Sequence, residues 1–304
     1  MNILVTGSNG MIGTRLCEVL LEKKHKVFGV DIIQNKYSSK VDKLTTSLDL
    51  LNRKDVLSSL PKKIDYVIHL AAYSRVMQTI VQPQQAIQNV EMLKNVMDYC
   101  LQEKVSGIVF SSSREVYGNI ESTSCSESDL GHAVENPYGA SKLACEAMLQ
   151  AYSTCYGLRY VTLRFSNIYG KYDEGERVIP YFMNLIHSGK NVEIYGKNKT
   201  LDFTYIDDAV QGIMLAVEKF SSVPNMSFNI ASGNGVELAT LAKQIAIALK
   251  KNLKIVYKAN RPGEVMRYVA EISKAKMELG YEPNYSIEMG LMKSVDWYRS
   301  LFLH

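Results

Sequence analysis

A tyrosine and a lysine four positions apart, Tyr138 and Lys142, are the residues of this sequence best suited to move a proton. They follow Asn136 and Pro137, which are typical of a helix N-cap and first helical position, so both side chains are expected on one helix face. A neighbouring ammonium lowers the pKa of a phenol, whose phenolate can then act as a general base. The sequence therefore predicts a proton-handling pair at the start of a helix.

The same spacing occurs once more, at Tyr195 and Lys199, and 19 tyrosines make such pairs expected by chance. The second pair lies in a glycine-containing turn without a partner motif. Tyr138 has the helix start and a candidate partner in Ser113, which follows an apolar run. An exposed helix pair is the alternative interpretation of Tyr138 and Lys142.

A glycine-rich turn near the start of the chain, TGSNGMIG at residues 6–13, is suited to bind phosphate. Gly7, Gly10 and Gly13 let backbone amides approach a pyrophosphate at the positive end of the following helix. The spacing is GxxGxxG rather than GxGxxG, and glycine-rich turns also serve plain packing. Asp31 ends the next apolar run, where a carboxylate can bind ribose hydroxyls and repel a 2′-phosphate. Together these features predict NAD rather than NADP.

Short apolar runs alternate with helical patterns through the first half of the chain. Such runs are rich in β-branched residues and are typical of parallel strands that helices bury on both faces. We therefore predict an α/β fold with a Rossmann-type doubly wound parallel sheet, which binds ligands at the carboxyl ends of its strands. The expected strands lie near residues 3–5, 27–30, 66–70, 108–110 and 160–164, and a helix is expected over 11–22.

The rhythm changes in the second half. A helix is expected over 178–188, a strand over 192–195 and another helix over 236–250. We divide the chain into an NAD-binding Rossmann domain with the catalytic residues, 1–165, and a smaller, partly intercalated C-terminal α/β lobe for the substrate, 166–304.

Composition excludes several classes of function. A formal net charge of +4 without a basic tract gives no indication of nucleic-acid binding. The five cysteines and five histidines show no zinc spacing, so no metal site is expected. No apolar run approaches the ~18 residues of a membrane span, and the first strand begins too early for a signal peptide. We expect a cytoplasmic protein with reduced thiols and no membrane partner.

The motifs, taken together, resemble the extended short-chain dehydrogenase/reductases, specifically their nucleotide-sugar epimerase/dehydratase branch. TGSNGMIG is similar to TGxxGxxG, and further matches are HLAA (69–72), FSSSREVYG (110–118) and NPYGASK (136–142). In the second half, RFSNIYG (164–170), DFTYIDD and RPGE (261–264) resemble substrate-lobe motifs. The resemblance covers nearly the whole chain and implies an enzyme that uses NAD on a nucleotide sugar.

The resemblance also implies which residues hold the cofactor. Asp49 and Leu50 stand where the family has an acidic residue near the adenine, HLAA lines the cofactor, and Asn89 matches an asparagine of the helix behind the active site. The expected cofactor contacts are Gly7, Asn9, Gly10, Met11, Ile12, Gly13, Asp31, Asp49, Leu50, Leu70, Ala71, Ala72, Asn89, Tyr138 and Lys142.

The implied mechanism is transient oxidation at C4 of the sugar. Tyr138 removes the proton of the 4-hydroxyl, Ser113 hydrogen-bonds the same oxygen, and the C4 hydride passes to a retained NAD. In a 4-epimerase the keto sugar turns over and takes the hydride back on its other face.

Substrate contacts are implied in both halves of the chain. Asn167 would meet the diphosphate, and Arg261 would contact a phosphate. Tyr268 would border the C2 substituent and disfavour N-acetylhexosamines, or else it is simply a packed aromatic. The expected set is Ser113, Asn167, Arg177, Arg261 and Tyr268. Many relatives also have an arginine where this chain has Leu201, and that phosphate contact would be absent or supplied by Arg177, Lys197 or Lys199.

The residues after Ser113 depart from the dehydratase pattern. Family 4,6-dehydratases have Asp-Glu there, and the aspartate protonates the departing 6-hydroxyl, whereas this chain has Arg114 and Glu115. Arginine is no general acid at neutral pH. Glu115 is a candidate catalytic base at C5, or else the partner of a neighbouring arginine.

We therefore expect a nucleoside-diphosphate-sugar 4-epimerase, most consistent with a UDP-hexose. A 4,6- or 5,6-eliminating dehydratase that uses Glu115 is the alternative. A non-catalytic NAD(H)-binding sensor is a third, although such proteins often lose the Tyr/Lys pair that this chain keeps. The helices over 84–103 and 138–156 correspond to those through which family members dimerise, so a homodimer is expected.

Overall fold

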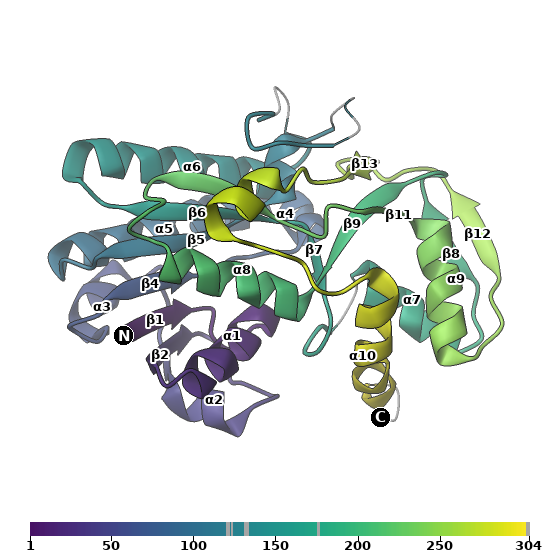
Figure 1. Cartoon of the computed structure of the whole chain (residues 1–304), viewed down its shortest axis with the longest axis horizontal. Coiled ribbons are helices and arrows are strands. Elements are labelled where there is room, and N and C mark those ends of the chain that lie inside the picture. The colour runs from purple at the N-terminus through teal and green to yellow at the C-terminus, as the bar shows by residue number, and fades with distance from the viewer. Residues whose placement is uncertain (120–121, 123, 131–133, 175–176, 302–304) are drawn as a thin grey trace.

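A seven-stranded sheet forms the centre of the computed structural model, which describes residues 1–119, 122, 124–130, 134–174 and 177–301 (Figure 1). Its strands lie in the order β10–β6–β5–β4–β1–β2–β3, and every neighbouring pair is parallel. This is the predicted doubly wound sheet. The strands are β1 (Asn2–Thr6), β2 (Lys26–Asp31), β3 (Thr45–Ser47), β4 (Tyr66–His69), β5 (Gly107–Ser113), β6 (Tyr160–Phe165) and β10 (Met226–Ile230).

Helices cover both faces of this sheet. Leu4 packs into the core beneath α3, α5 and α6, while its neighbours Ile3 and Val5 pack into the core beneath α1 and α8, because successive strand residues point to opposite faces. In the described part of the chain, no helix has the length and apolarity needed to cross a membrane. The helices are α1 (Met11–Glu22), α3 (Arg53–Ser59), α5 (Gln84–Gln102), α6 (Pro137–Tyr156) and α8 (Ile206–Glu218).

Shorter segments connect these elements. They are the α-helices α2 (Ser39–Leu44) and α4 (Val76–Val81), the 3-10 turn η1 (Arg114–Tyr117) and the π-turn η2 (Ala275–Leu279).

The second half adds two small sheets beside the main one (Figure 1). β9 pairs with β7, β11 and β13, and β8 pairs in parallel with β12. Helices α7, α9 and α10 pack around them. The bounds are β7 (Asn167–Tyr169), α7 (Val178–His187), β8 (Val192–Tyr195), β9 (Thr200–Tyr205), β11 (Gly235–Glu237), α9 (Leu238–Leu249), β12 (Ile255–Lys258), β13 (Arg267–Tyr268) and α10 (Ile287–Ser300).

The two halves of the chain are interleaved. β10 of the second half pairs with β6 at the edge of the main sheet, and α8 covers one face of that sheet next to α1. A buried ion pair between Arg164 on β6 and Glu146 on α6, with Nη2 and Oε2 2.7 Å apart, fixes this edge to the opposite layer. The cleft described next is therefore built on a frame to which both halves contribute.

Candidate active site

A large cleft of about 1610 Å³ follows the carboxyl ends of the main strands and continues to the small sheets. Its volume exceeds the ~300–1,000 Å³ of an ordinary small-molecule pocket, which suits two ligands lying end to end. Both halves of the chain line it, from Gly7 and Asp31 at one end to Tyr195 and Arg261 at the other.

The glycine turn at the start of α1 has the shape of a phosphate cradle. Gly7 has φ +71°, and a Cβ there would lie 2.7 Å from the backbone nitrogen of Ala71. A Cβ on Gly13 would overlap the carbonyl oxygen of Gly7. No side chain caps α1 at Gly10, so its first amides are not blocked from an anion. These features fit a dinucleotide pyrophosphate.

Asp31 stands at the end of β2, on the cleft wall. Its Oδ2 accepts a hydrogen bond from the backbone N–H of Asn9 at 2.9 Å, and its Oδ1 accepts one from the N–H of Ile33 at 3.1 Å. Burial raises the pKa of Asp31, and these amides oppose that shift. The carboxylate thus ties the glycine turn to β2 and keeps lone pairs for ribose hydroxyls.

Most of the expected cofactor residues line the cleft, but two asparagines lie behind its wall. Asn89 is buried; its Oδ1 accepts from the N–H of Tyr73 at 2.8 Å, and its Nδ2 donates to Ser141 at 3.2 Å. Asn9, also buried, donates through Nδ2 to the carbonyl of Ile33 at 2.6 Å. The lining residues are Gly7, Gly10, Met11, Ile12, Gly13, Asp31, Asp49, Leu50, Leu70, Ala71, Ala72, Tyr138 and Lys142.

Tyr138, Lys142 and Ser113 meet in the middle of the cleft. Tyr138 and Lys142 lie in the first turns of α6, and Ser113 ends β5. The ammonium of Lys142 donates to the carbonyl of Ser111 at 2.8 Å and lies 5.8 Å from the centre of the Tyr138 ring. Asn136 caps α6 through the N–H of Gly139 at 2.9 Å, and Pro137 occupies the first turn.

The acidities of the pair differ from the sequence-based expectation. Burial raises the pKa of Tyr138 to about 12, although a hydrogen bond with Ser113 opposes this rise. Burial also lowers the pKa of Lys142 to about 8. Lys142 is not among the main influences on the phenol in the protein alone, because its ammonium turns toward Ser111. The Ser113 hydrogen bond and the charge of Arg177 oppose the rise, and the cationic ring of bound oxidised NAD would lower the pKa of Tyr138 further.

Glu115 lines the cleft, but both of its carboxylate oxygens are engaged. Oε1 lies 2.7 Å from Nη2 of Arg114, and Oε2 accepts from Nδ2 of Asn136 at 2.8 Å. The side chain is only 6% exposed. The arginine partner considered from the sequence is therefore Arg114.

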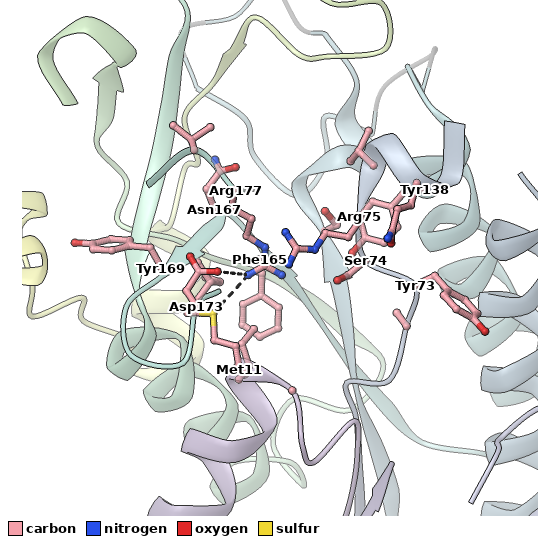
Figure 2. A pocket seen from close by; sticks show the side chains of 18 of the residues that line it. Met11, Tyr73, Ser74, Arg75, Tyr138, Phe165, Asn167, Tyr169, Asp173 and Arg177 are labelled. Carbon is pink, nitrogen blue, oxygen red and sulfur yellow. Dashed lines mark hydrogen bonds and ion pairs between the residues drawn. The ribbon is translucent and has the colours of Figure 1, made fainter. Parts of the chain in front are cut away.

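Three of the remaining expected substrate residues, Asn167, Arg177 and Arg261, line the cleft. Asn167 accepts from Nε of Arg114 at 3.2 Å. Arg177 reaches across to Met11, with Nη1 3.4 Å from the sulfur, and its Nη1 lies 3.5 Å from Asp173 (Figure 2).

Tyr268 agrees with the second of its two sequence-based interpretations, a packed aromatic, and does not lie beside the expected position of the sugar. It is 1% exposed, and among the described residues it does not belong to the lining of the cleft. Its ring lies 5.6 Å from the guanidinium carbon of Arg114 and stacks on Tyr117. The short strand β13 directs this side chain into the core, so Arg114 stands between it and the cleft.

Many relatives have an arginine at the position that Leu201 occupies in this chain. Two of the three basic residues considered as replacements for its phosphate contact lie in the cleft. Arg177 and Lys199 line it, whereas Lys197 is exposed outside. Lys199 is buried and pairs with Glu264 at 2.6 Å.

The sequence did not single out Arg75 or Asp173. Arg75 follows β4, and Figure 2 shows its guanidinium approaching that of Arg177 from the opposite wall; its Nη2 donates to the carbonyl of Glu174 at 3.0 Å. Burial raises the pKa of Asp173 to about 6, although the positive charge of Arg177 lowers it. Arg75 lies six residues after the end of β4, directly before α4, and neither its position nor that of Asp173 gave a local signal in the sequence.

Among the described residues, no group of three or more His, Cys, Asp or Glu side chains is arranged so that it could hold a metal ion.

Comparison with known proteins gives consistent matches. The profile of the NAD dependent epimerase/dehydratase family matches residues 3–231. UDP-glucuronate 4-epimerase 1 of Arabidopsis thaliana is 31% identical over 99% of this chain and 77% of its own length. A crystal structure of a Thermotoga maritima UDP-glucose 4-epimerase with UDP-glucose superposes with a TM-score of 0.92 at 30% identity, covering 99% and 100% of the two chains. A dTDP-glucose 4,6-dehydratase of Streptomyces venezuelae with NAD bound has a TM-score of 0.90 at 27% identity, covering 99% and 97%.

Proposed function

The chain belongs to the NAD-dependent epimerase/dehydratase family, and on that basis we propose that it is a nucleoside-diphosphate-sugar 4-epimerase, with UDP-hexoses as its preferred substrates. It is an enzyme of the extended short-chain dehydrogenase/reductase group, and its cofactor is NAD. The glycine turn, Asp31 and Lys142 are the residues that would hold this cofactor. Bound NAD would accept the hydride from C4 of the sugar. The residues of the chain would transfer the proton and orient the substrate.

The work of the chain itself is proton transfer and orientation. Tyr138 takes the proton of the 4-hydroxyl and returns it, and Ser113 holds the same oxygen by a hydrogen bond. Lys142 stabilises the phenolate when it forms, because an ammonium favours a nearby negative charge. We propose Asn167, Arg177 and Arg261 as the groups that orient the nucleotide and its diphosphate in the other half of the cleft.

The contacts of the Glu115 carboxylate are the observation that favours an epimerase over a dehydratase. A dehydratase needs a base at C5 and an acid at C6. Glu115 has both oxygens occupied by Arg114 and Asn136, and Arg114 has replaced the acid. These two contacts hold the carboxylate against Arg114 and Asn136, and either would have to be rearranged before Glu115 could take a proton from C5. This arrangement supports a reaction that stops at C4 and leaves C5–H intact.

Dehydration is the second candidate, since dTDP-glucose 4,6-dehydratases are among the relatives. The sensor alternative has less support. Burial disfavours the charged forms of both Tyr138 and Lys142, and proton transfer in catalysis is the role that explains why the chain keeps this buried pair.

Turnover in D₂O separates the two reactions. We expect UDP-glucose or UDP-glucuronate to yield a product of unchanged mass, inverted at C4 and without deuterium on carbon. Deuterium at C5 or C6, or loss of one water, would instead establish dehydration. Mass spectrometry and proton NMR of the product read both outcomes.

Replacement of Glu115 provides an independent control. Glu115→Gln keeps an acceptor for Asn136 but abolishes any base, so an epimerase should keep at least a tenth of its kcat, whereas a dehydratase that used this base would lose about 10²–10⁴-fold.

Three wider features belong to the same proposal. We place the boundary between the NAD-binding domain and the substrate lobe at residues 165 and 166, where β6 gives way to β7. We also propose a homodimer formed through α5 and α6. A cytoplasmic location accords with five cysteines that form no disulfide.

A further inference from the structure

The side chain of Asn136 makes more contacts than an N-cap needs. Its Oδ1 accepts from the N–H of Gly139 at 2.9 Å, which is the cap. Its Nδ2 donates twice, to Oε2 of Glu115 at 2.8 Å and to the carbonyl of Gly263 at 3.1 Å. The residue is 6% exposed. One buried amide therefore joins the catalytic helix, the η1 turn that follows β5 and a turn of the second half.

That turn forms part of the wall at the substrate end of the cleft. The N–H of Glu264 donates to the carbonyl of Arg261 at 3.2 Å, Pro262 follows Arg261, and Gly263 has φ +77°. Proline and a left-handed glycine at these positions are typical of a type II turn. Arg261 and Glu264 line the cleft on either side of Gly263, and Glu264 is paired with Lys199 at 2.6 Å.

The turn lies directly against the start of α6. A Cβ on Gly263 would be 3.1 Å from the side chain of Ile80 and in van der Waals contact with the carbonyl oxygen of Glu135 at 3.4 Å and the Cβ of Asn136 at 3.7 Å. Asn136 is two residues before Tyr138. A displacement of the turn is therefore passed to the first turn of α6, which holds the phenol.

We propose that Asn136 is a positioning residue that couples occupation of the Arg261 turn by an anionic nucleotide to the placement of Tyr138. This inference rests on the proposed function for the role of Tyr138. The nucleotide binds Arg261, the turn settles, and the Gly263–Asn136 hydrogen bond fixes the start of α6 in its reactive position. Substrate binding at one end of the cleft thus raises kcat at the other, because small misplacement of a catalytic group costs up to about 10²-fold.

A double-mutant cycle tests the coupling. Asn136→Ser keeps an oxygen for the N–H of Gly139 and removes both amide donors, so α6 remains capped. We expect Asn136→Ser and Arg261→Gln each to lower kcat about tenfold, and the double variant to lower it about tenfold rather than about a hundredfold. The KM penalty of Arg261→Gln should persist in both backgrounds. Additive losses of kcat, or an unchanged kcat in Asn136→Ser, would overturn the proposal.

Asn52→Ser is the matched control. Asn52 caps α3 through the N–H of Asp55, and its Nδ2 donates only within its own turn, to Asp55 at 2.6 Å. This variant should leave kcat unchanged, and its melting temperature reports what the exchange of an asparagine cap for a serine cap costs by itself.

Hydrogen exchange reads the coupling without turnover. UDP, or dTDP if UDP does not bind, should slow amide exchange over residues 138–142 in the NAD-loaded wild type but not in Asn136→Ser. Equal slowing in both proteins would refute the coupling even if the enzyme proves to be an epimerase. Slowing in the wild type alone would support it even if the product proves to be dehydrated, so failure of one proposal is distinct from failure of the other.

Discussion

Tyr138 is held in its neutral form by burial until a ligand changes its surroundings. The pKa of this phenol is raised to about 12 in the protein alone, so proton removal from a sugar is favoured by the positive charge of the nicotinamide ring that arrives with the oxidised cofactor. We expect Tyr138→Phe, which keeps the ring, to bind NAD normally and to lose about 10²–10⁴-fold in kcat. Steady-state kinetics with cofactor content as a control checks this, and a loss below tenfold would place the base elsewhere.

Burial disfavours the charged form of Lys142 relative to that of a surface lysine, and this makes the folding stability of the protein depend on pH. Its pKa falls from 10.5 to about 8 through burial, so the unfolded chain binds more protons between these values and stability rises with pH across that window. At pH 7 the burial costs about 3 kcal/mol. Melting temperatures of cofactor-free protein should show Lys142→Met gaining most over the wild type below pH 8, with the gain shrinking toward pH 10. A gain that does not change with pH would contradict this account.

At the scale of elements, α6 joins catalysis to the fold through close backbone contact. A Cβ on Gly139 would lie 2.6 Å from the carbonyl oxygen of Glu115, whereas nothing lies within 4 Å of one on Gly157, the left-handed residue that ends the helix. Gly139→Ala should therefore shift the start of α6 and lower kcat at least tenfold. Gly157→Ala should cost about 1 kcal/mol of stability, from its positive φ, and leave kcat unchanged. Equal activities for the two variants would argue against the contact.

The same elements show what could be predicted from the sequence. The helix over 11–22 has the predicted bounds because the glycine turn and the apolar spacing are local signals. The return of β10 to the main sheet depends on pairing with β6 across more than sixty intervening residues, for which no local pattern exists. Glu115 and Tyr268 show the same limit at the site, since only the structure reveals that Arg114 engages the first and stands between the second and the cleft.

One exposed helical surface of the molecule is suited to bind a second copy of the chain. α5 and α6 pack side by side on one face of the sheet (Figure 1). The outward side of α6 is smooth, because four exposed alanines follow one another at helical spacing, and Ile87 on α5 is 63% exposed. Small side chains let helices of two protomers approach closely, and burial of Ile87 would add hydrophobic stabilisation. The alanines are Ala140, Ala144, Ala147 and Ala151.

A single charge on this surface should separate the two copies. Ala147→Arg puts a long cation at the centre of the alanine stripe without harming helix propensity, so a dimer formed there should dissociate while each protomer stays folded. Ile247→Arg is the control, because Ile247 is a 76% exposed apolar residue on α9, remote from α5 and α6. Sedimentation velocity should give a dimer for the wild type and Ile247→Arg and a monomer for Ala147→Arg, with unchanged circular dichroism. A wild-type monomer would refute the homodimer, and a dimeric Ala147→Arg would move the interface to another face.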